Sequence, residues 1–200
     1  ALVESGSITR MLKGNRGITI DGVQHPRTVF TLWSEAERNA IGIYTVEIDN
    51  SKKKDEKWYI NTDITYTFGS GKVTGSYGDA TARAHADTKW TQSEIDAGEA
   101  PEGADTNTVK TKGLKTVLIT QVKEQAQNEL NITDWYVTRK SEKDTAIPGS
   151  ITTHRDAVRA KQAEMETAIT NASDTPALET LYTRNSEGVR PLGDLPILED

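Results

Sequence analysis

The sequence predicts an α+β protein with an N-terminal antiparallel β-rich domain followed by a C-terminal helical module. In residues 1–80, short runs rich in Val, Ile, Thr and Tyr alternate with glycine-containing turns, which is typical of antiparallel strands. From Leu114 onward, apolar residues recur at spacings of three and four, the period of a helix with one buried face. The apolar fraction is 34%, against roughly 45–50% in ordinary globular domains. The core is therefore thin, divided, or completed by a partner.

The β-rich domain, residues 1–80, is expected to contain short antiparallel strands and one short helix. Asp21 and Gly22 stand between two short β-rich runs, which is a strong hairpin signal. Residues 29–33, with the sequence VFTLW, are interpreted as a further strand. Residues 64–68 alternate Ile, Tyr and Phe with threonine, so the three larger side chains are expected on one face of a strand.

The short helix of this domain is predicted from its two ends. Ser34 and Glu37 have the spacing of a capping box, in which each side chain accepts a hydrogen bond from the other residue's backbone N–H. Gly42 lies where a glycine commonly ends a helix.

Residues 69–72 read Gly-Ser-Gly-Lys and resemble the end of a phosphate-binding loop. The Walker pattern fails, because Tyr66 stands where its first glycine belongs and Val73 follows the lysine where Ser or Thr is required. The segment lies between two predicted strands, so a hairpin turn is predicted instead.

Residues 81–112 are predicted to be a loose linker or an extended arm. Ala, Asp, Gly, Thr and Pro dominate this stretch, and such a segment can become ordered only against a neighbouring molecule. Thr91 and Glu94 have capping-box spacing, which predicts a single helical turn.

The helical module is predicted to span residues 113–187. Its first helix covers residues 114–130. A short helix follows, capped by Thr133 or Asp134, and it carries adjacent aromatic residues that are expected to point toward different surfaces.

A long helix is predicted from about residue 151 to residue 172. The last helix has Pro176 in its first turn, where proline is well tolerated. Residues 188–200 form a C-terminal tail whose apolar residues should pack on the same chain or on a neighbour.

Composition narrows the functional classes. The net charge is −6, whereas nucleic-acid-binding proteins usually present a basic face. The one basic run, residues 52–54, is followed directly by acidic residues. The absence of cysteine excludes disulfides and thiolate ligands. The sequence shows neither an apolar run of about 20 residues nor a signal-peptide pattern, so we expect synthesis and folding in a cytoplasm.

Catalytic and metal-binding patterns are not found in the sequence. His25, His85 and His154 lie far apart and lack metal-ligand spacing. The carboxylates are numerous but scattered, although sequence alone does not exclude two of them facing each other in a sugar-cleaving cleft. The four Trp and six Tyr residues could form a stacking platform, but core positions are the commoner role of such side chains. We therefore expect no enzyme, no catalytic residue, no metal and no cofactor.

The region around residues 132–182 resembles the C-terminal part of tail and baseplate structural proteins of tailed bacteriophages. That pattern has the order D-W-Y, R-K, a proline, and a helix with R-x-A-[VI]-R. The matching residues are Asp134, Trp135, Tyr136, Arg139, Lys140, Pro148, Arg155, Ala157, Val158 and Arg159. Residues 32–44 resemble an upstream segment of such proteins, whereas residues 45–112 show no match.

The resemblance implies a virion structural protein, made in the host cytoplasm, that joins or docks tail, baseplate and fibre proteins in several symmetric copies. A tail or fibre assembly chaperone outside the virion and a host-glycan-binding receptor module are the alternatives. We expect no nucleic-acid partner and no membrane span. The candidate interface or anchor residues are Trp135, Tyr136, Arg139, Arg155, Arg159, Leu192, Leu195, Ile197 and Leu198.

Overall fold

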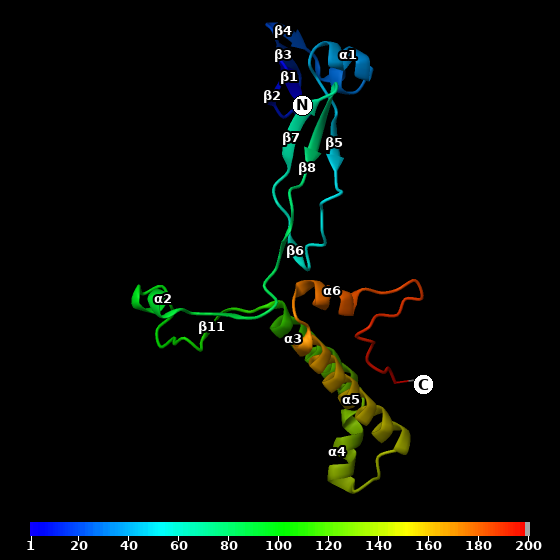
Figure 1. Cartoon of the computed structure of the whole chain (residues 1–200). Coiled ribbons are helices and arrows are strands. Elements are labelled where there is room, and N and C mark those ends of the chain that lie inside the picture. Colours follow the sequence, from blue (N-terminus) through cyan, green and yellow to red (C-terminus); the bar gives the residue numbers. More distant parts are fainter. Residues whose placement is uncertain (199–200) are drawn as a thin grey trace. The chain divides into compact units, whose positions relative to one another are not determined.

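The structure is a computed structural model that describes residues 1–198 (Figure 1). It confirms the predicted α+β class, with strands and small sheets before a helical region. The chain divides into two compact units, Ala1–Thr81 and Ala82–Asp200. The expected linker and the expected helical module both belong to the second unit. Each unit is described separately.

The first unit is built from small sheets and two short helices. Its strands are β1 (Leu2–Glu4), β2 (Ser7–Arg10), β3 (Ile18–Ile20), β4 (Val23–His25), β5 (Val46–Asp49), β6 (Tyr59–Ile60), β7 (Thr65–Gly69) and β8 (Lys72–Ser76); β9 (Thr81–Ala82) contains the division between the units. Antiparallel hairpins join β1 with β2, β3 with β4, and β7 with β8.

The hairpin turns form where the sequence predicts them. Asp21 and Gly22 both have positive φ, and so do Ser70 and Gly71. Two successive residues of this kind give the turn whose twist matches paired strands. The Gly-Ser-Gly-Lys segment is thus confirmed as a hairpin turn between β7 and β8.

Two details of the β region differ from the expectation. Strand β5 pairs with β8 in parallel, with Val46 opposite Val73. The long connection from β5 to β8, residues 50–71, permits this, because parallel neighbours need a crossover rather than a tight turn. Residues 29–33 do not form a strand. Pro26 precedes a 3₁₀ helix, η1 (Arg27–Phe30), whose turn places Val29 in the core with no exposed surface.

Strand β1 contributes to two hydrophobic clusters of the first unit. Leu2 packs with a cluster that includes Ile18 and Val29, whereas Val3 packs with Ala1 and Val73. Successive side chains of a strand point to opposite faces, so one short strand supplies both clusters.

The predicted helix is α1 (Glu35–Ala40). Its capping box between Ser34 and Glu37 is confirmed, and Gly42 follows with φ 79°. The backbone oxygen of Gly42 accepts a 2.8 Å hydrogen bond from the Val3 amide of β1.

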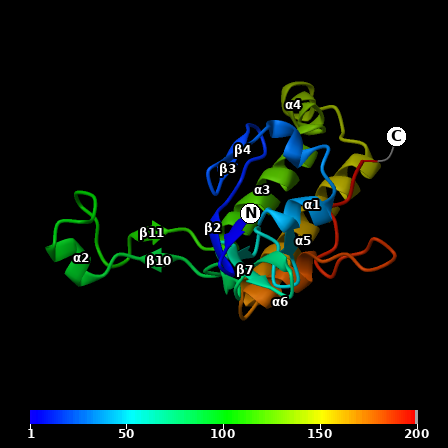
Figure 2. The same cartoon turned by 90° about the horizontal axis from the view of Figure 1, so that it is seen from above.

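The second unit contains a helical bundle and an arm. Its helices are α2 (Gln92–Asp96), α3 (Leu114–Asn131), α4 (Asp134–Lys143), α5 (Gly149–Asn171) and α6 (Thr175–Tyr182), and its arm strands are β10 (Thr88–Lys89) and β11 (Val109–Thr111). Helices α3 and α5 lie side by side along their length (Figures 1 and 2). No helix among residues 1–198 is long and apolar enough to span a membrane.

The α3–α5 core follows helical spacing. On α3 the buried residues Leu118, Val122, Ala126 and Leu130 recur every four positions. On α5 the buried apolar residues are Ile151, Val158, Met165 and Ile169. Val117 of the same helix lies outside this buried stripe and is 39% exposed.

The arm extends away from the helices (Figures 1 and 2). Strands β10 and β11 pair antiparallel, and α2 between them begins with the predicted capping box of Thr91 and Glu94. At its base, the Gly113 amide donates a 2.7 Å hydrogen bond to Oδ1 of Asp87, and the Leu114 amide donates to the Ala84 carbonyl at 3.0 Å. These bonds attach the arm to the first turn of α3.

Candidate functional site

The aromatic pair of α4 forms a cluster with a cation. The rings of Trp135 and Tyr136 lie 3.8 Å apart between centroids, at an interplanar angle of 32°. The guanidinium carbon of Arg139 lies 4.7 Å from the Trp135 ring centroid and 5.3 Å from that of Tyr136. We call these three residues the α4 surface. The expectation that the two aromatic side chains point to different surfaces is therefore wrong, because stacking and the shared cation draw them together.

The α4 surface is open to solvent. Trp135 is 51% exposed, although a tryptophan is a large and mostly apolar side chain. Tyr136 and Arg139 are half-buried. Ile132 and Val137, on either side of the pair in sequence, are also exposed. This is a local concentration of apolar area that the fold of the described residues does not cover.

Arg155 holds the base of α4 from inside the helical unit. Its Nη1 donates to the Leu130 carbonyl at 2.8 Å and to Oγ1 of Thr133 at 2.7 Å. The same nitrogen lies 2.9 Å from Oδ1 of Asp134. Arg155 is only 9% exposed and Thr133 is fully buried.

The unpaired carbonyl groups at the end of α3 explain why Arg155 makes these contacts. The last carbonyls of a helix lack partners within the helix and carry partial negative charge, so a buried guanidinium satisfies the carbonyl of Leu130. The Thr133 hydroxyl also donates to this carbonyl, at 3.0 Å. Arg155 therefore fixes the corner between α3 and α4 and positions the α4 surface without belonging to it.

The other predicted anchor residues do not form one surface with α4. Arg159 is exposed and lies 3.5 Å from Asp156 on its own helix. Leu192 is buried, and Leu195 packs against the cluster of Ala126, Leu130 and Val158. Ile197 is 71% exposed and Leu198 is half-buried.

The tail carries ion pairs that no sequence prediction included. Arg184 and Arg190 both contact Asp194, at 2.9 and 2.8 Å. The hydrogen bonds from Arg184, with the charges of Arg190 and Arg184, hold the pKa of Asp194 below its usual value. The spacing of four between Arg190 and Asp194 was the available signal. These bonds place Leu192 and Leu195 inward, so half of the apolar tail belongs to the chain's own core.

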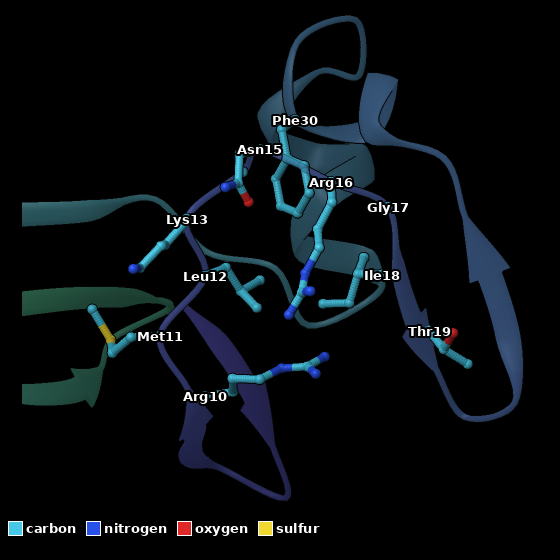
Figure 3. A pocket seen from close by; sticks show the side chains of 11 residues that line it. Arg10, Met11, Leu12, Lys13, Asn15, Arg16, Gly17, Ile18, Thr19 and Phe30 are labelled. Atoms are coloured by element: carbon cyan, nitrogen blue, oxygen red, sulfur yellow. The ribbon is translucent and has the colours of Figure 1, made fainter.

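The first unit contains a pocket that no sequence prediction included. An open pocket of about 700 Å³ is lined by residues 10–19 and Phe30. Figure 3 shows Arg10 and Arg16 extending into it with their guanidinium groups toward one another, while Lys13 turns to one side. Leu12, Ile18 and Phe30 supply apolar walls.

The sequence contained a signal for this pocket. No Asp or Glu occurs between Glu4 and Asp21, although acidic residues outnumber basic ones in the chain. Arg10, Lys13 and Arg16 all fall inside this window. Cationic side chains without acidic neighbours are typical of anion-binding surfaces.

No group of three or more His, Asp or Glu residues within 1–198 is arranged to hold a metal ion. Comparisons of the chain with protein-family models, with curated proteins and with solved structures found no match.

Proposed function

We propose that this chain is a structural protein of a tailed-bacteriophage virion. In this role it is a tail or baseplate component, made in the host cytoplasm, that joins neighbouring tail and fibre proteins in several symmetric copies. The α4 surface is the observation that carries the proposal. Trp135, Tyr136 and Arg139 belong to the D-W-Y and R-K pattern that resembles phage tail proteins, and the same residues form the exposed cluster.

The composition of the α4 surface suits a binding contact. Tryptophan, tyrosine and arginine are the residue types most enriched among those that dominate binding energy at protein interfaces. Stacking and the Arg139 contact restrict both rings before any partner arrives. Restriction in the free protein lowers the entropy lost on binding. The buried Arg155 adds to this, because it fixes the start of the helix.

The partner we assign to this surface is another virion protein with an apolar pocket rimmed by carboxylates. Arg139 and Lys140 supply positive charge beside the rings, and Lys143 adds to it in the last turn of α4. Complementary charge at the rim of an interface sets orientation and association rate. Repeated copies related by symmetry would multiply this contact around the tail axis.

The arm and other exposed apolar residues support an assembly role. Val109 on the arm, Val189 near the tail and Ile197 are all more than 40% exposed. Scattered apolar residues are normal on surfaces, but a protein that is built into a larger particle buries many of them.

The test is genetic and biochemical. Particles are purified from cells infected with phage that carries either the natural gene or a Trp135→Ala variant, and the copy number of this protein is measured by mass spectrometry. We expect the natural protein in stoichiometric amounts. We expect Trp135→Ala to fold but to be depleted from particles at least tenfold, because its side chain is half exposed and contributes more to binding than to the core.

Val23→Ala is the matched control, since Val23 is an exposed apolar residue of β4, outside the α4 surface and the apolar residues beside it. It should enter particles normally. A chain found in infected cells but absent from purified particles would refute the virion role and favour an assembly chaperone. Specific binding of host polysaccharide that Trp135→Ala leaves intact would favour the receptor module.

A further inference from the structure

The pocket of the first unit contains two guanidinium groups without a protein acceptor. Neither the Arg10 nor the Arg16 side chain forms a hydrogen bond or an ion pair with another side chain in the described part of the chain. Figure 3 shows both groups directed into the same opening. Two like charges that converge repel each other unless an anion lies between them. Each guanidinium carries five N–H donors in a planar fork that fits carboxylate or phosphate oxygens.

The backbone near both arginines contacts neighbouring elements of the first unit. Arg10 ends β2 and pairs with Leu2, a buried residue of β1. Arg16 lies between two constrained glycines. Gly14 has φ +66° and faces the Phe30 ring, and a Cβ at Gly17 would lie 2.7 Å from the His25 carbonyl oxygen. The backbone on either side of Arg16 therefore lies against residues of η1 and β4.

The volume and the lining residues of the pocket indicate which kind of ligand would fit it. A volume of about 700 Å³ lies in the range of pockets that bind small organic molecules and exceeds what a single inorganic ion fills. Leu12, Ile18 and Phe30 offer apolar contact next to the two charges. A ligand with an anionic group and an apolar or aromatic body would satisfy both parts of the pocket.

We infer that this pocket binds a small organic anion, with a carboxylate or phosphate group between Arg10 and Arg16 and its body against Leu12 and Phe30. The inference does not depend on the virion role, because it rests on the first unit alone. Lys13 contributes long-range attraction from the rim, since Figure 3 shows it turned away from the opening.

Isothermal titration calorimetry of the full chain with phenyl phosphate tests the inference. Inorganic phosphate supplies the charge without the body, and phenol supplies the body without the charge. We expect saturable binding of phenyl phosphate, at least tenfold weaker binding of inorganic phosphate, and no measurable binding of phenol. Arg10→Ala and Arg16→Ala should each weaken phenyl phosphate binding about tenfold or more, and Arg16→Lys should fall between Arg16→Ala and the natural protein.

Arg27→Ala is the matched control, because it removes an exposed arginine of the same unit that does not line the pocket. It should leave the affinity unchanged, and circular dichroism should show that every variant is folded. Binding that Arg10→Ala and Arg16→Ala leave unchanged would overturn the inference. Equal affinities for phenyl phosphate and inorganic phosphate would also overturn it, and so would a loss of affinity in Arg27→Ala equal to that in the other two variants.

A protein segment can also present an anionic group beside an aromatic ring. A short peptide with Asp beside Phe tests this second source of the ligand. If it binds more tightly than phenyl phosphate, the occupant is a protein segment and the assignment to a small organic anion fails.

Discussion

Replacing Arg155 by alanine tests whether this buried guanidinium holds the α3–α4 corner. The substitution removes two hydrogen bonds, to the Leu130 carbonyl and to Oγ1 of Thr133, and an ion pair with Asp134. Breaking a buried charged pair costs about 3–5 kcal/mol. The Asp134 side chain is 50% exposed, so water takes over part of its role. We therefore expect the free energy of unfolding of the helical unit to fall by about 3 kcal/mol.

Urea denaturation followed by circular dichroism at 222 nm measures this loss, because the helices of the second unit supply most of that signal. Arg159→Ala is the control on the same helix. Its side chain is 53% exposed and, among the described residues, forms an ion pair with Asp156 alone, so a loss below about 0.5 kcal/mol is expected. Equal midpoints for Arg155→Ala and Arg159→Ala would refute the assigned role of Arg155.

Two further variants separate packing from hydrogen bonding at this corner. Arg155→Met keeps much of the apolar stem and should still lose about 2 kcal/mol, because the Leu130 carbonyl loses its charged donor. Thr133→Val keeps the shape of a fully buried side chain but removes its hydroxyl, which should cost about 1–2 kcal/mol. The double variant Thr133→Val with Arg155→Ala should lose less than the sum of the two single losses, because both remove the same hydrogen bond.

Two other predictions concern the arm. Gly113→Ala should destabilise the junction with α3 by about 1–3 kcal/mol, because a Cβ there would lie 2.3 Å from the Ala86 carbonyl group. Gly149→Ala, with open space around its Cβ, should be neutral or slightly stabilising in the same denaturation assay, and a similar loss in both variants would contradict the steric argument. The hydrogen bond from Lys110, with those from Thr91, lowers the pKa of Glu94 to about 2. The ionised carboxylate therefore stabilises the start of α2 above its ordinary pKa near 4.5, and this stabilisation is lost as the pH falls toward 2. NMR titration should show that low pKa, and Lys110→Met should raise it; an unchanged pKa in the variant would rule out Lys110 as the main cause.

The sequence by itself determined the features that depend on contacts between residues a few positions apart. The capping boxes of Ser34 and Thr91 rest on hydrogen bonds that span three positions. The turns at residues 21–22 and 70–71 rest on backbone conformations of adjacent residues. Such contacts form with little loss of chain entropy, so local patterns were sufficient to predict them. The α+β class followed from the same local signals.

Only the tertiary structure decided the features that join distant residues. The parallel pairing of β5 with β8 depends on where a long connection returns the chain. Residues 29–33 follow the β pattern, yet burial of Val29 favours a 3₁₀ turn. The tail's Arg184, Arg190 and Asp194 decide that Leu192 points inward.

The candidate sites, too, combine features that the sequence predicts with features that only the tertiary structure decides. Composition and resemblance identified Trp135, Tyr136 and Arg139 as candidates, but only the fold brings them into contact and fixes them through Arg155, which lies 25 positions from Leu130. Arg155 stood among the candidate interface residues because it belongs to the sequence pattern that carries the resemblance. The fold buries it, because the unpaired carbonyl at the end of α3 provides an acceptor that no local pattern in the sequence reveals.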